Sequence, residues 1–322
     1  MKYIIASLMC LITLTSVASA QTITGAGATF PYPVYAKWAD EYKKQTGTII
    51  NYQSIGSGAG IKQIKAGTVT FGASDMPLPK DELEKDGLVQ FPTVLGALTL
   101  IFNLDGIDKQ ITLDADTVNR IYMGEVKNWN DAAISKHNPG VSFPNFPIVV
   151  VYRSDGSGTT YVFTQYLSAV SDAWKTKVGS NTSVKFPVGF GGKGNEGVAA
   201  TVKQIKGSIG YVEFAYVKQN KLTYTNLINS SGVMVEPNLK SFQAGSGIIN
   251  NKDKSAWPIT SLTYILIHKN PKDVKLTDSV LKFFEWVYKN GDDMAIQLDY
   301  IPLSKEVKES IMKNEWTQIK RN

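Results

Sequence analysis

The residues best suited to chemistry lie in the stretch 153–160, which reads RSDGSGTT. It directly follows the apolar, β-branched run 148–152, so the pattern predicts a strand, a tight glycine turn and the start of a helix. The first N–H groups of a helix lack intrahelical partners and carry a positive partial charge. Ser157 and Thr159 add hydroxyl donors, and Arg153 adds a permanent charge with a planar fork of donors. The stretch suits a small oxyanion, and a capped helix beside a surface arginine explains it equally well.

Two further glycine turns have the same setting, between a predicted strand and a predicted helix. They are Gly25–Phe30 and Gly56–Gly60, and they offer the hydroxyls of Thr29 and Ser57 beside free backbone N–H groups. In open α/β sheets, ligands bind at the carboxyl ends of the strands. Three such turns in one chain therefore favour a common binding site over three unrelated loops.

Asp75 stands at the end of a fourth predicted strand, over residues 69–73. A carboxylate repels an anion unless the anion carries a proton to donate, because an ionised carboxylate only accepts hydrogen bonds. Phosphate keeps a proton near neutral pH and sulfate does not, so Asp75 favours a protonated oxyanion. A cap for the turn that precedes Pro77 is an equally good explanation.

Asp155 lies two residues after Arg153 in the same turn. Its carboxylate could hold the guanidinium by charge-assisted hydrogen bonds. It could also cap the helix that follows, and the two roles are compatible.

The first twenty residues have the features of a secretory signal peptide. A basic start is followed by an apolar run and by the small residues 18–20, so we expect cleavage after Ala20. This removes Cys10, the only cysteine, and leaves no disulfide and no thiolate. The neighbours of Cys10 do not resemble a lipid-anchor site. We therefore expect a secreted chain, long enough at about 300 residues for roughly two domains.

The formal net charge of the whole chain is +6, and its 34 basic and 28 acidic side chains are interspersed. The absence of a basic block argues against a nucleic-acid partner and is compatible with a protein that meets small anions.

Strands and helices alternate along the chain, which predicts an α/β fold. The apolar runs 94–103 and 259–268 are long enough to be strands that cross between two lobes. The segment 230–255 is rich in Ser, Gly and Asn and lacks periodicity, so we expect a loop there.

Other chemistries have weak support. Residues 192–197 match the dinucleotide fingerprint G-x-G-x-x-G, with Glu213 near the spacing of a ribose contact, but the preceding segment contains Pro187 and is a poor central strand. His137 and His268 have no partner at metal-ligand spacing, and no nucleophile–base pair is evident. We therefore expect no catalysis, no metal and no cofactor.

Five segments together resemble one known family. They are TGAGATFP at 24–31, FGASD at 71–75, DGSGT at 155–159, FGGKGN at 190–195 and AWPITS at 256–261. In this order they are similar to the periplasmic phosphate-binding proteins of high-affinity phosphate ABC transporters. The likeness covers essentially the whole chain after the signal peptide.

The resemblance implies a type II periplasmic-binding-protein fold, in which two α/β lobes are joined by two crossover strands. It implies one lobe at 21–95 plus 258–322 and the other at 96–257. It also makes the fingerprint at 192–197 a structural turn. The implied phosphate contacts come from Thr29, the backbone N–H of Phe30, Ser57, Asp75 as proton acceptor, Arg153 held by Asp155, Ser157, Gly158 and Thr159.

The expected function is therefore that of a monomeric, non-catalytic receptor that binds inorganic phosphate in the periplasm. Hinge closure would prepare it to dock on the membrane permease of an ABC importer. Two alternatives stay open at this point. One is a receptor for another tetrahedral anion, such as sulfate or molybdate, and the other is a secreted enzyme acting on phosphate esters.

Overall fold

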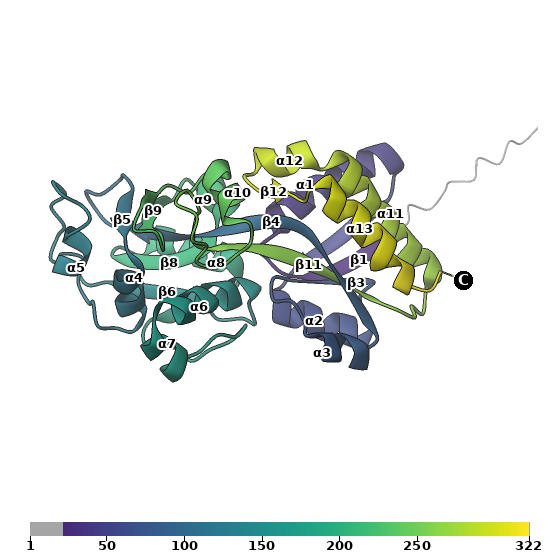
Figure 1. Ribbon diagram of the computed structural model, residues 1–322, viewed down its shortest axis with the longest axis horizontal. Helices are drawn as coiled ribbons and strands as arrows, with labels where there is room; N and C mark the ends of the chain where they lie inside the picture. Colours follow the sequence, from purple (N-terminus) through teal and green to yellow (C-terminus); the bar gives the residue numbers. More distant parts are fainter. Residues whose placement is uncertain (1–21, 322) are drawn as a thin grey trace, which may run out of the picture.

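A computed structural model describes residues 22–321 as two lobes that lie side by side (Figure 1). Each lobe has a core of its own. The first is built around Trp38, Phe91 and Phe284, and the second is built around Trp129 and Tyr211. The predicted α/β class with two lobes is confirmed. The predicted signal peptide, its cleavage site after Ala20 and Cys10 lie outside the described residues.

The first lobe is formed by both ends of the described chain. Its N-terminal part contains β1 (Thr22–Gly27), α1 (Tyr32–Thr46), β2 (Ile49–Ser54), α2 (Ser57–Ala66), β3 (Phe71–Ser74) and α3 (Lys80–Lys85). Its C-terminal part contains α11 (Val274–Asn290), α12 (Asp292–Gln297), β12 (Ile301–Pro302), α13 (Lys305–Asn314) and the 3₁₀ turn η1 (Trp316–Gln318).

The second lobe is formed by the middle of the chain. It contains β5 (Ile111–Leu113), α4 (Ala115–Tyr122), α5 (Ala132–Ser135), β6 (Val149–Arg153), α6 (Gly158–Val170), α7 (Asp172–Lys177), β7 (Phe190–Gly192), α8 (Gly194–Gln204), β8 (Ser208–Glu213), α9 (Phe214–Asn220), β9 (Thr223–Ile228), β10 (Met234–Val235) and α10 (Leu239–Gly245).

Two long strands join the lobes, β4 (Leu88–Asn103) and β11 (Thr260–His268), and Figure 1 shows β4 running through both. They pair in antiparallel register from Thr260 opposite Ala97 to His268 opposite Leu88. Both crossing strands were expected from the sequence, although β4 begins at Leu88 rather than at Val94. Its early residues pair with β11 in the first lobe, and its late residues pair with β8 in the second.

The sheet runs in the order β2-β1-β3-β11-β4-β8-β6-β7. In the first lobe, alternate residues of one strand enter different cores: Ile265 and Ile267 pack with α1 and α11, whereas Leu266 packs with Ile64 of α2. Successive side chains of a strand point to opposite faces of the sheet. Helices therefore cover both faces, with α1 and α11 on one and α2 on the other. Because β1, β2 and β3 are parallel, their carboxyl ends meet at one edge.

The segment 230–255 is more ordered than a loop, so that prediction was partly wrong. It contains β10 and α10, and α10 begins with a reciprocal pair of caps between Asn238 and Ser241. A helix of seven residues is too short to show a hydrophobic period. Within residues 22–321, no helix combines the length and apolar character needed to cross a bilayer.

Candidate functional site

The three glycine turns and Asp75 meet where the two lobes face each other. From the first lobe come the loop after β1, the start of α2 and Asp75 after β3, and from the second comes the turn between β6 and α6. The backbones touch directly across the cleft, since the N–H of Gly58 donates to the carbonyl of Gly156 at 2.9 Å. A Cβ atom at Gly158 would lie 2.5 Å from both Asp75 Oδ2 and Ser57 Oγ. Glycine at position 158 therefore permits this close approach.

Arg153 is buried in the cleft with 5% of its surface exposed, which excludes the surface-arginine explanation. Its Nε donates to Asp155 Oδ1 at 2.8 Å, and Nη2 donates to Asp155 Oδ2 at 2.6 Å. Burial acts to raise the pKa of Asp155, and the bonds from Arg153 nevertheless hold it below its ordinary value. Asp155 thus fixes the guanidinium. It does not cap α6, because the capping side chain there is Ser157.

Asp75 is 1% exposed. Thr263 on β11 donates its hydroxyl to Oδ1 at 2.8 Å, and Oδ2 has no hydrogen-bond partner within the described residues. Burial raises the pKa of Asp75 to about 7, against the opposing effects of the Thr263 bond and the Arg153 charge. Asp75 does not cap its turn, because the hydroxyl of Ser74 bonds both the N–H and the carbonyl of Met76. The unpartnered oxygen is free to accept a hydrogen bond from a protonated ligand.

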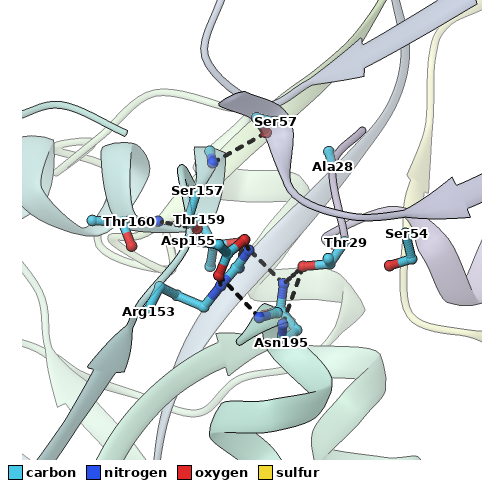
Figure 2. A network of polar contacts seen from close by, with 12 residues as sticks. Ala28, Thr29, Ser54, Ser57, Arg153, Asp155, Ser157, Thr159, Thr160 and Asn195 are labelled. Atoms are coloured by element: carbon cyan, nitrogen blue, oxygen red, sulfur yellow. Dashed lines mark hydrogen bonds and ion pairs between the residues drawn. The ribbon is translucent and has the colours of Figure 1, made fainter. Parts of the chain in front are cut away.

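Asn195, at the start of α8, joins hydroxyls from both lobes (Figure 2). Its Nδ2 donates to Thr29 Oγ1 at 2.6 Å and to Thr159 Oγ1 at 3.1 Å, and its backbone N–H also donates to Thr29 Oγ1. The segment 192–197 is therefore more than a structural turn. No sequence pattern singled out Asn195 as a site residue, although it ends one of the five segments that carry the resemblance.

The hydroxyls of the site already accept hydrogen bonds from the protein. Ser57 Oγ accepts from the N–H groups of Asp75 and Gly158, at 3.2 and 3.1 Å. Thr159 Oγ1 accepts from Arg153 Nη1 at 3.2 Å as well as from Asn195. Ser157 Oγ accepts from the N–H of Thr160 as the cap of α6. With their oxygens so engaged, these hydroxyls face a ligand as hydrogen-bond donors.

Three tyrosine hydroxyls hold the loop that follows β1. Tyr52 bonds the carbonyl of Ala28 at 2.7 Å, Tyr216 that of Thr29 at 2.6 Å, and Tyr300 that of Phe30 at 2.6 Å. In a trans peptide the N–H points opposite to the carbonyl, so the bonds of Tyr52 and Tyr216 also orient the N–H groups of Thr29 and Phe30. The bond of Tyr300 holds the Phe30–Pro31 peptide, which has no N–H. These tyrosines come from distant parts of the chain, and no local pattern connected them to the loop.

The dinucleotide interpretation has no support in the structure. Glu213 is fully buried and bonded to Ala215 and Tyr300, so it cannot meet a ribose. The strand before the fingerprint, β7, lies at the end of the sheet rather than in its centre. No group of three or more metal-ligating side chains occurs within residues 22–321.

Comparison with known proteins identifies the family. The family model for the PBP superfamily domain matches residues 15–290. A phosphate-binding protein PstS of Pasteurella multocida is 49% identical over 94% of this chain and 92% of its own length. A phosphate-binding protein PstS of Methanocaldococcus jannaschii is 32% identical over 82% of this chain and 78% of its own length.

This chain belongs to the PstS family of phosphate-binding proteins. The predicted family and the prediction of a non-catalytic receptor are confirmed, because the PstS family is one of binding proteins.

Solved structures support the fold of this PstS family member. A high affinity periplasmic phosphate-binding protein bound with phosphate covers 91% of this chain with a TM-score of 0.72 and 21% identity. A putative phosphate ABC transporter substrate-binding protein from Clostridium perfringens covers 88% with a TM-score of 0.68 and 21% identity. At this level of identity the likeness concerns the architecture alone.

Proposed function

We propose that this chain binds inorganic phosphate between its two lobes and serves as the substrate-binding component of a phosphate ABC importer. The observation that carries the proposal is the set of hydrogen-bond donors and acceptors that the buried site offers. The hydroxyls of Ser57 and Thr159 meet a ligand as donors, beside the permanent charge of Arg153. Asp75 Oδ2 is the one carboxyl oxygen of the site that lacks a donor. A partly protonated oxyanion matches both features.

The proposed phosphate contacts are those expected from the sequence. Hydroxyls, backbone N–H groups and the guanidinium donate to phosphate oxygens, and Asp75 accepts a hydrogen bond from the protonated phosphate oxygen. The proposed set is Thr29, the N–H of Phe30, Ser57, Asp75, Arg153, Ser157, Gly158 and Thr159, with Asp155 holding Arg153 and Asn195 orienting the hydroxyls of Thr29 and Thr159.

Selectivity follows from counting donors and acceptors. A fully ionised sulfate has no hydrogen to donate, so its oxygen would face the carboxylate oxygen of Asp75 in a buried site whenever Asp75 is ionised, which is its main form above pH 7. An unpaired buried polar group costs about 1–3 kcal/mol, and more when it is charged. Sites that require a particular hydrogen bond reject analogues that lack it far more strongly than sites that select by size. We therefore infer that phosphate is preferred over sulfate and molybdate.

The two lobes would open and close around the ligand. We place one lobe at 21–95 plus 258–322 and the other at 96–257, because the two cores separate between Val94 and Ala97 and close to residue 258, since Trp257 and Ile259 still pack in the second core and Ile265 packs in the first. Within residues 22–321, only β4 and β11 cross this boundary as strands, so they would form the hinge. The proposal includes a monomer in the periplasm that presents its closed form to the permease.

Calorimetric titration of mature, phosphate-stripped protein tests this function. We expect one phosphate per chain and no heat from sulfate or molybdate near pH 8, where Asp75 is mostly ionised. An assay with a chromogenic phosphate ester, with and without divalent metal, should show no hydrolysis. Absence of phosphate binding by folded protein, or turnover of the ester, would contradict the proposal.

A further inference from the structure

Tyr300 lies between two buried oxygen atoms that belong to different lobes. Its hydroxyl oxygen is 2.6 Å from the carbonyl oxygen of Phe30 and 2.7 Å from Oε2 of Glu213. None of these three residues is exposed. Both distances are those of short hydrogen bonds between oxygens, so each contact needs a hydrogen.

The hydroxyl of Tyr300 has a single hydrogen, which cannot serve both contacts. The carbonyl of Phe30 can only accept, so the hydrogen of Tyr300 must point to it. The second contact then requires a hydrogen from Glu213, which a carboxylate does not have. A protonated Glu213 supplies it from Oε2, and the same oxygen still accepts the N–H of Ala215 at 2.9 Å.

The surroundings of Glu213 favour this protonated form. Burial raises the pKa of Glu213 well above its ordinary value, against the effect of its hydrogen bonds. Asp299 adds a nearby negative charge, although Lys218 pairs with it at 2.5 Å. Oε1 of Glu213 has no partner within the described residues, so an ionised Glu213 would place charge on an unsolvated oxygen.

We propose that Glu213 is a protonated positioning residue, which acts through Tyr300 to hold the carbonyl of Phe30 and with it the anion-binding loop after β1. The relay runs from Glu213 to Tyr300 to Phe30, with each hydroxyl hydrogen pointing toward the loop. This inference rests on the proposed function, because the loop it holds is the one proposed to bind phosphate. Glu213 lies opposite Leu98 of the crossing strand β4 in the pairing of β4 with β8. The relay therefore connects the loop after β1 in the first lobe with β8 of the second lobe, beside a strand that joins the two.

The protonation can be tested without any substitution. Infrared spectra of the ligand-free protein at pH 8, with and without ¹³C-labelled glutamate, separate protonated glutamic acid from ionised glutamate. Glu213 is the only fully buried glutamate within residues 22–321, so one isotope-sensitive carboxylic acid band is expected. It should persist in phosphate-loaded protein and disappear in Glu213→Gln. Absence of that band from the wild-type protein would overturn the proposal.

The positioning role is tested by Tyr300→Phe, with Tyr288→Phe as the matched control. Both hydroxyls bond a first-lobe carbonyl at 2.6 Å, but Tyr288 bonds Pro92, which is outside the site. Tyr300→Phe should weaken phosphate binding roughly tenfold, the effect of one lost buried hydrogen bond. Tyr288→Phe should leave the affinity unchanged.

Equal phosphate affinities for Tyr300→Phe and the wild-type protein would overturn the positioning role. Failure of the wild-type protein itself to bind phosphate would contradict the proposed function and the positioning role together. The two failures are distinguishable, because the second is seen before any residue is changed and leaves the infrared band in place.

Discussion

The carboxylate of Asp155 accepts two parallel hydrogen bonds from the guanidinium of Arg153, of 2.8 and 2.6 Å. The pair fixes the plane of the guanidinium and leaves Nη1 to bond Thr159. Because the geometry is set before a ligand arrives, less conformational entropy is lost when an anion binds.

Replacing Arg153 by alanine should therefore weaken phosphate binding severely. The guanidinium is a buried, charged donor that also bonds Asp155 and Thr159. Its loss should raise the Kd for phosphate roughly a hundredfold or more. Arg120→Ala in the same lobe is the control, since its side chain is 37% exposed and its ion pairs in the described part of the chain are with the surface carboxylates of Asp116 and Glu125. Calorimetric titration of both variants checks the prediction, and an unchanged affinity of Arg153→Ala would remove this residue from the site.

Asn195→Ala should loosen the hydroxyls of Thr29 and Thr159. Their oxygens would lose the amide that holds them, so each hydroxyl could turn away from the ligand. We expect phosphate binding to weaken about tenfold, in line with one or two buried hydrogen bonds. Asn138→Ala is a matched control, because Asn138 is also buried but bonds only the backbone of Thr112 and Ile134. It should lower the stability and leave the affinity alone; a similar loss of affinity in both variants would refute the role of Asn195.

Gly158→Ala should hinder closure. Its methyl group would lie 2.5 Å from Asp75 Oδ2 and Ser57 Oγ, which are atoms of the opposite lobe. Alanine is a good helix former at the start of α6, so the variant should fold normally. We expect phosphate affinity to fall by about one order of magnitude or more, with little change in the thermal midpoint of the ligand-free protein. Wild-type affinity in this variant would mean that the two lobes do not approach each other as described.

The ligand-free protein should respond to pH through Asp75. Burial between the lobes raises the pKa of Asp75 from 3.8 to about 7. When the lobes are closed, Asp75 therefore keeps its proton at pH values where a solvent-exposed carboxyl, as in an open form, is ionised. The closed form is thus favoured at low pH, and this advantage is lost as the pH rises from about 4 through 7. Small-angle scattering should show the radius of gyration increasing between pH 5 and pH 8. In Asp75→Asn the increase should be absent, and an identical response of both proteins would contradict the assignment.

Much of the site could be predicted because its donors lie in local patterns. A strand, a glycine turn and a helix start can be seen in consecutive residues, and this pattern located Thr29, Ser57 and Ser157 to Thr159. The carboxylate of Asp75 was noticed because it contradicts the charge of an anion site. Each of these inferences needed only the residues adjacent in the chain.

The parts that were missed depend on contacts between distant residues. Asn195 bonds Thr29 across 166 positions, and Tyr300 bonds Phe30 across 270. Nothing near Tyr300 in the sequence distinguishes it from a core tyrosine. The seven-residue helix α10 was not predicted for a different reason. What marks it in the sequence is the cap formed by Asn238 and Ser241 rather than a hydrophobic period.

The most direct test of the whole account is a paired titration of the wild-type protein and Asp75→Asn with phosphate and with sulfate near pH 8, where Asp75 is mostly ionised and phosphate still carries a proton. The amide of asparagine is similar in size to the carboxyl group but has no negative charge, and it can donate a hydrogen bond to a fully ionised anion. We predict that the wild-type protein binds phosphate only and that Asp75→Asn also binds sulfate. Complete rejection of sulfate by Asp75→Asn, with phosphate binding intact, would contradict the claim that Asp75 selects the anion by its proton.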